Sequence, residues 1–126
     1  MGFFGDFIRC TKASRRFGHG TRQMRRDEFA NARDTFIGAL QLLGVDEPKN
    51  VTGAVWFSAR FQALKGLAQC AAKLGDVPLA RSSIEEAIAL WDNTANLGPA
   101  SKYPGLPEWM AWARDYVART EQGDVH

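Results

Sequence analysis

The stretch from Phe61 to Asp92 constrains the fold more than any other part of the chain, because its apolar residues recur at helical intervals. They are spaced by three or four positions before Gly75 and Asp76, and the same spacing returns after this pair. Such spacing places them on one face of each of two helices joined by a tight turn. The two stripes are Leu64, Leu67, Ala68, Ala71 and Leu74 before the turn, and Ala80, Ile84, Ala87, Ile88 and Trp91 after it.

Several of these stripe residues are alanines, and small side chains let two helix backbones approach closely. Ala68 and Ala71 precede the turn, and Ala80 and Ala87 follow it. A helix pair with small residues at its crossing and large ones beside it is typical of a stacking unit. Stacked helix pairs create extended binding surfaces, so the pattern favours a binding protein over a catalyst.

The same stretch resembles the tetratricopeptide repeat, a helix–turn–helix module of about 34 residues. If the repeat starts at Phe61, the family's leucine-then-small pair falls on Leu67 and Ala68, and its inter-helix turn on Gly75 and Asp76. The later motif positions fall on Ala80, Ile84, Ala87 and Leu90, in the order small, large apolar, small and apolar. The resemblance implies helical hairpins stacked around a concave, ligand-binding face.

Two positions depart from the family pattern. Ala71 stands where the first helix of the family carries an aromatic residue, and Asp92 stands where the repeat closes with proline. The identification of a tetratricopeptide-like unit therefore rests on the small residues and the turn.

The chain also matches itself at a spacing of 48 positions. A first, less regular unit then starts near Ala13, with Gly20 at the small position of its first helix and Asp27 and Glu28 in its turn. The matching pairs are Phe29 and Val77, Ala32 and Ala80, Arg33 and Arg81, Phe36 and Ile84, Ala39 and Ala87, Leu40 and Ile88, and Leu42 and Leu90. Because this spacing exceeds the family period, we expect an insertion within 46–60.

Two units are fewer than helical arrays usually need, so the flanking segments are expected to act as caps. Pro48 predicts a loop at 47–50, and the Gly- and Pro-rich stretch 97–106 predicts another. Pro107 then suits the first turn of a final helix. The predicted helices span residues 3–24, 27–43, 52–74, 77–95 and 107–121. They form a single all-α domain (1–126), a short array of antiparallel hairpins with a C-terminal capping helix.

The final helix carries an apolar stripe of Trp109, Ala113, Tyr116 and Val117, with Trp112 beside it. We favour the interpretation that these aromatics cover the last hairpin and seal its core. The alternative is an exposed aromatic patch for a partner, since Trp and Tyr are enriched at interaction hot spots.

The repeated pattern also predicts the core and the cellular context. The expected buried residues are Phe36, Ala39, Leu40, Leu67, Ala71, Ala80, Ile84 and Ala87. Alternating β-strand patterns are absent, and no apolar run reaches membrane-spanning length. Cys10 and Cys70 lie within helical patterns and need not meet, so we expect them to be reduced and at least half-buried in a cytoplasmic protein.

Charge is distributed unevenly along the chain. Residues 1–26 contain seven basic residues against Asp6 alone, a net charge of +6, and the remainder carries −4. Phe3, Phe7, Cys10 and Phe17 share one helical face in this basic segment. Such a helix can lie on an anionic membrane surface or hold an acidic partner. The favoured alternative is that this face packs onto Phe29 and Phe36 and leaves the arginines in solvent.

No pattern indicates catalysis, a metal site or a cofactor. His19 and His126 are the two histidines, and neither has a Cys/His partner at metal-ligand spacing. We expect the acidic residues Glu85, Glu86 and Asp115 to pair with Arg81, Arg114 and Arg119 on solvated helix faces. A pI near 8.7 and the lack of a recognition signature argue against nucleic-acid binding. An enzyme is not expected.

Two functional classes remain. The first is a small adaptor that binds a peptide or partner protein on its concave helical face, as the tetratricopeptide resemblance implies. The family's ligand-facing positions fall here on Arg25, Gln62, Lys65, Gln69 and Lys73. Amide and ammonium groups suit an acidic or C-terminal peptide. The second class is a dedicated inhibitor or chaperone of one partner, such as a bacterial immunity protein or a secretion chaperone.

Overall fold

The computed structural model describes residues 3–44, 53–93 and 97–121, and within these ranges the regular structure is helical, without strands. The helices are α1 (Phe3–Arg25), α2 (Phe29–Leu43), α3 (Gly53–Lys73), α4 (Val77–Asn93), the short 3-10 helix η2 (Ala100–Lys102) and α5 (Leu106–Glu121). The five predicted helices are confirmed. Their predicted ends at Thr52 and Ala95, and the predicted loop at 47–50, lie outside the described residues.

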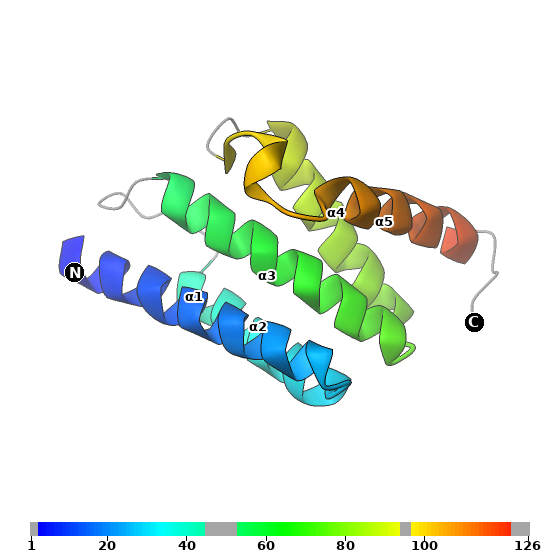
Figure 1. Ribbon diagram of the computed structural model, residues 1–126, viewed down its shortest axis with the longest axis horizontal. Coiled ribbons are helices and arrows are strands. Elements are labelled where there is room, and N and C mark those ends of the chain that lie inside the picture. The colour runs from blue at the N-terminus through cyan, green and yellow to red at the C-terminus, as the bar shows by residue number, and fades with distance from the viewer. Residues whose placement is uncertain (1–2, 45–52, 94–96, 122–126) are drawn as a thin grey trace.

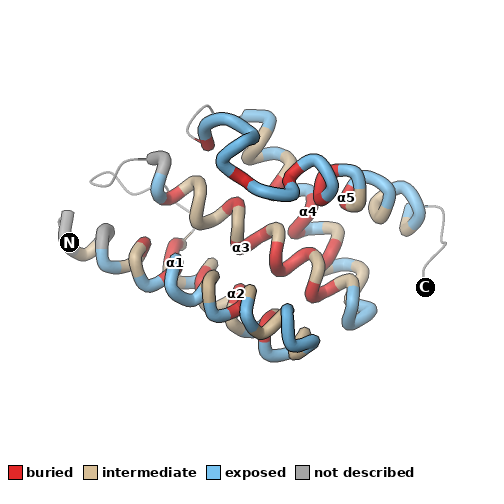
Figure 2. The backbone as a smooth tube through the Cα atoms, in the orientation of Figure 1, coloured by how far each residue is buried: buried red, intermediate tan, exposed pale blue. Residues whose placement is uncertain are grey.

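The helices form two layers. In Figure 1, α1, α3 and α5 face the viewer, and α2 and α4 lie behind them. Each helix packs against the next along the chain, and α1 also packs against α3. The central helix α3 is therefore the most enclosed, and buried positions recur along most of its length in Figure 2.

The two hairpin turns have the same geometry, 48 positions apart. Asp27 and Gly75 both adopt a positive φ, of 60° and 78°. The hydrogen bonds run from Asp27 N to Met24 O, Gly75 N to Ala72 O, Glu28 N to Gln23 O and Asp76 N to Ala71 O, at 2.9–3.2 Å. The predicted correspondence between the hairpins is thus confirmed at the level of the backbone.

The predicted core is confirmed with one exception and one related correction. Seven of the eight predicted residues are buried, whereas Leu40 is only half-buried, although it packs against both core clusters. Leu74, which the helical spacing placed on the apolar stripe, is 41% exposed. It follows the last residue of α3 and therefore lies past the helix crossing.

One aromatic ring organises the contact between α1, α2 and α3. Phe36 is fully buried, and its ring lies against Gly20 and Gly66. A Cβ atom at Gly20 would lie 2.8 Å from this ring, and one at Gly66 would lie 2.5 Å away. Only glycine fits at both positions without rearrangement, which confirms the small position predicted at Gly20.

The segment after α4 belongs to the core, although its composition predicted a plain loop. Tyr103 is 2% exposed, and its hydroxyl donates to the carbonyl of Leu97 at 2.7 Å. Its ring packs edge-on against Phe61 and Trp91, with centroids 5.3 and 5.8 Å apart. Trp109 in α5 joins the same cluster. The predicted sealing of the second core by α5 is confirmed.

The predicted ion pairs are only partly correct. Arg119 pairs with Asp115 at 2.9 Å, as expected. Glu86 does not pair with Arg81: it binds Arg60 of α3 at 2.7 Å. Arg81 instead reaches across to Glu121 of α5, at 3.2 Å. Long side chains thus join different helices here, whereas the sequence favoured neighbours on one helix.

Candidate binding groove

The front face of α3 carries four of the five predicted ligand-facing residues. Gln62, Lys65, Gln69 and Lys73 follow one another at intervals of three or four positions. They therefore form a single row along the helix. Gln62, Lys65 and Gln69 are half-buried, and Lys73 is exposed. The row forms the floor of the candidate site.

This floor runs along three adjoining hollows, of about 370, 630 and 450 Å³, which we call the α3 groove. Neighbouring hollows share lining residues: Phe17 and Gln62 join the first two, and Met24 and Gln69 join the last two. One wall comes from α1, through Ser14, Phe17, Thr21, Met24 and Arg25, and continues at Phe29. The opposite wall comes from Lys102, Pro104, Gly105, Trp109, Trp112, Tyr116 and Arg119.

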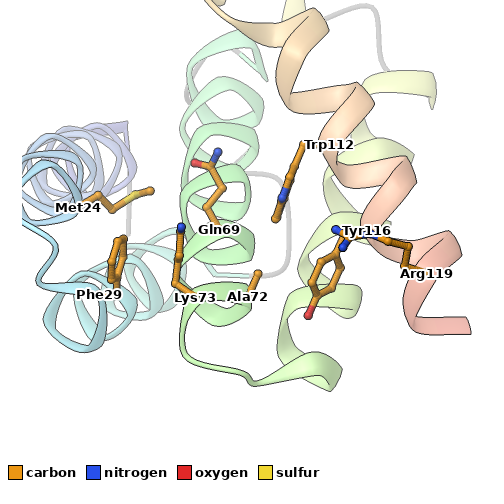
Figure 3. A pocket seen from close by; sticks show the side chains of 8 residues that line it. All are labelled: Met24, Phe29, Gln69, Ala72, Lys73, Trp112, Tyr116 and Arg119. Carbon is orange, nitrogen blue, oxygen red and sulfur yellow. The ribbon is translucent and has the colours of Figure 1, made fainter. Parts of the chain in front are cut away.

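The structure brings all five predicted residues into this groove. Arg25, Gln62, Lys65 and Gln69 line the middle hollow, with Arg25 contributed by α1. Lys73 lines the last hollow, where it lies on α3 between the aromatic residues of the two walls, as Figure 3 shows. The positions that the tetratricopeptide resemblance implies as ligand-facing therefore lie on the floor and at one edge of this groove.

Lys65 has an unusual environment for a lysine. Its Nζ lies 5.6 Å from the ring centroid of Phe61 and 5.9 Å from that of Trp109. Burial lowers its pKa from the ordinary value. Its hydrogen bond to Gln62 Oε1 is long, at 3.5 Å, and no carboxylate of the described residues pairs with it. Aromatic faces attract the ammonium group but do not neutralise it, so it retains the capacity to bind an anion.

The groove as a whole is cationic. Its described lining residues include no aspartate or glutamate. They include five cations, Arg25, Lys65, Lys73, Lys102 and Arg119. Of these, Arg119 is already paired with Asp115. A groove lined by one sign of charge focuses its field on ligands of the opposite sign.

The sequence did not place Trp112 and Tyr116 in the site. Their rings stack 5.5 Å apart at an interplanar angle of 30°. Both are half-buried, and they face Met24 and Phe29 across the floor. The final helix thus seals the core through Trp109 and also offers an aromatic wall. The sequence signal was present, since Trp112 lay beside the apolar stripe rather than within it.

Both cysteines lie in the first core cluster, away from solvent. Burial raises the pKa of the Cys70 thiol to about 11, so it stays protonated at neutral pH and is a poor nucleophile. Cys10 is likewise buried, and neither cysteine forms a disulfide. Among the described residues, His, Cys, Asp and Glu do not gather into a group of three that suits a metal ion.

The basic residues of α1 lie largely outside the α3 groove. One face of α1 presents exposed side chains at Lys12, Arg15, His19 and Arg22, and Arg26 is exposed just after the helix. Phe17, by contrast, packs towards Phe36 with ring centroids 6.0 Å apart. The side chains of Phe3 and Phe7 lie outside the described set. No helix within the described ranges has the length and hydropathy needed to cross a membrane.

The comparisons with known proteins gave no match. No family model matches the chain, and no curated protein or solved structure shows significant similarity to it.

Proposed function

We propose that this protein is a small tetratricopeptide-like interaction module that binds an acidic segment of a partner protein in the α3 groove. One observation carries the proposal: a continuous groove lined by cations, amides and aromatic rings has no acidic residue among its described lining residues. Amide side chains on its floor can hydrogen-bond a peptide backbone, and the cations can meet carboxylates.

The dimensions of the floor define the length of the ligand. At a rise of 1.5 Å per residue, the row from Gln62 to Lys73 is about 16 Å long. About five residues of extended chain span that distance. A short segment is therefore sufficient to contact the whole row, with affinity in the micromolar range that we expect of such adaptors.

The second class, a dedicated inhibitor or chaperone, differs in the size of the interface. Such a protein would bind one folded partner over a standard interface of about 1,600 Å². The groove favours the adaptor, because a trough admits a single chain segment more readily than a folded surface. The buried, free cysteines suit the reducing cytoplasm in which we place the adaptor.

The test is charge reversal at Lys65 and Lys73 together. The probe is a fluorescein-labelled decapeptide of glutamate and aspartate with two leucines, and the readout is fluorescence polarisation. We expect the double variant to bind this peptide more than about tenfold more weakly, a loss of about 1.4 kcal/mol, with little change in melting temperature.

The matched control reverses Lys12 and Arg22, which are exposed on α1 outside the groove. It changes the net charge equally and should keep most of the affinity at physiological salt. If the peptide does not bind the wild-type protein, or if both double variants lose affinity equally, the groove assignment is wrong.

A further inference from the structure

A second groove lies between α4 and α5 and differs from the α3 groove in charge. It encloses about 570 Å³ and is lined by Ile84, Glu85, Ile88, Ala89, Asp92, Asn93, Arg114, Val117, Ala118 and Glu121. Isoleucine, valine and alanine side chains contribute its apolar surface. Three carboxylates and one guanidinium contribute its charge. We call it the α4–α5 groove.

The shape of the groove indicates what kind of ligand fits there. Its lining residues follow α4 from Ile84 to Asn93 and α5 from Arg114 to Glu121. The groove therefore runs along two helices that pack against each other. A third helix can pack its side chains into such a trough. A helix is therefore the natural occupant of the α4–α5 groove.

The charges indicate what kind of helix fits. Glu85 and Asp92 are exposed, seven positions apart, and neither forms an ion pair within the described residues. Their counterparts 48 positions earlier are Ile37 and Gly44. Ile37 is half-buried and packs against the first core cluster. The first hairpin thus places an apolar side chain against its core at Ile37, whereas the second hairpin carries the carboxylate of Glu85 at the matching position.

The remaining charges of the groove do not cancel these two carboxylates. Glu121 already pairs with Arg81, at 3.2 Å. Arg114 is the one cation among the described lining residues, so carboxylates outnumber it in the groove. An occupant with lysine or arginine at its flanks complements this rim, and an occupant with an acidic flank is repelled.

We infer that the α4–α5 groove docks an amphipathic helix of a partner protein, with its apolar face on the isoleucines and basic residues beside Glu85 and Asp92. The lining from Ile84 to Asn93 is about 14 Å long, which matches about ten residues of helix. Apolar anchors at positions i, i+4 and i+7 of the ligand fit such a groove. This site is distinct from the α3 groove, because no residue lines both and their charges have opposite signs.

The experiment uses a synthetic, fluorescein-labelled 14-residue helix as probe, with leucines at i, i+4 and i+7 and lysines on both flanks. A matched peptide carries glutamates in place of the lysines. We expect the lysine peptide to bind at least about tenfold more tightly than the glutamate peptide, measured on the protein with Lys65 and Lys73 reversed so that the α3 groove does not take up the acidic peptide.

Two variants locate the binding. Glu85→Lys with Asp92→Lys reverses the rim, and Ala118→Phe fills the groove at an exposed position that a larger side chain does not force into the core. Each should weaken the lysine peptide at least about tenfold. Asp34→Lys with Glu108→Lys is the control, because both residues are exposed and line neither groove.

The outcomes separate this inference from the proposed function. Reversal of Lys65 and Lys73 should leave the lysine peptide unaffected even if it abolishes binding of the acidic decapeptide. The inference is overturned if the lysine peptide fails to bind, or if the control variant weakens it as much as the rim variant. It is also overturned if sedimentation shows a dimer that Ala118→Phe dissociates, since the occupant is then a second copy of this chain.

Discussion

The two hairpins, α1–α2 and α3–α4, follow one backbone plan and fill it with different side chains. Their turns share the same hydrogen bonds and the same positive φ, yet the residue at that φ is Asp27 in one and Gly75 in the other. The main core residue is Phe36 in the first hairpin and Ile84 in the second. Spacing along the chain thus sets the backbone, and side-chain identity remains free to differ.

The difference between Phe36 and Ile84 changes how each core is closed. The Phe36 ring fits because Gly20 and Gly66 have no side chains. The first core is therefore closed by helices that approach each other closely. Ile84 belongs to a cluster that includes Tyr103 and Trp109, so the second core is closed by a loop and by α5. Repeats of one plan are therefore not interchangeable.

The largest expected effect comes from a charge at the helix crossings. Ala32 and Ala80 are both fully buried and correspond to each other. Ala32→Glu and Ala80→Glu should each cost at least about 3 kcal/mol, because a carboxylate would be buried without a partner. Chemical denaturation measures both. If one variant unfolds like the wild type, the two crossings are not equivalent.

A smaller effect is expected where Phe36 meets glycine. Gly66→Ala should destabilise the protein by about 1–3 kcal/mol, because the new Cβ overlaps the Phe36 ring. Adding Phe36→Leu should recover part of this loss. The control is Gly18→Ala, whose Cβ meets only the flexible Arg22 side chain at 3.7 Å. That substitution should stabilise α1 by about 1 kcal/mol, because alanine favours helix. If Gly66→Ala and Gly18→Ala had equal melting temperatures, the close packing of Phe36 against Gly66 would be refuted.

The smallest expected changes in stability come from substitutions in the two hairpin turns. Gly75→Ala should cost about 1 kcal/mol, because alanine is disfavoured at a positive φ. Asp27→Gly should change stability by no more than about 0.5 kcal/mol, since relief of strain is offset by the greater entropy of the unfolded chain. Thermal denaturation of both variants provides the measurement. A large gain for Asp27→Gly would show that the first turn is more strained than the second.

Helical periodicity predicted most of the fold, because it reports which face of a helix is apolar. It could not indicate how deeply each apolar residue is buried. Leu40 is only half-buried although it packs against both clusters, and Leu74 is exposed because it lies beyond a crossing. The row from Gln62 to Lys73 was predictable for the same reason, since it lies on one helix.

The walls of the α3 groove were harder to predict, because they depend on contacts between distant segments. Tyr103 joins the core through a carbonyl in its own loop, which composition alone did not reveal. Trp112 and Tyr116 face Met24 and Phe29, which lie far away in the sequence. Arg60 on α3 likewise pairs with Glu86 on α4, which is distant in the sequence. Spacing within one helix contains no information about such pairings.

The position of Phe36 has a consequence for ligand selectivity. The ring is out of reach of any ligand, yet it spaces α1 from α3 at Gly20 and Gly66 and contacts Phe17, which lines the groove. The buried Phe36 ring therefore determines the width of the α3 groove, although it does not line the groove itself. Exchanging this hidden ring would alter the thickness of the chain that the groove admits while every ligand-contacting side chain stayed the same.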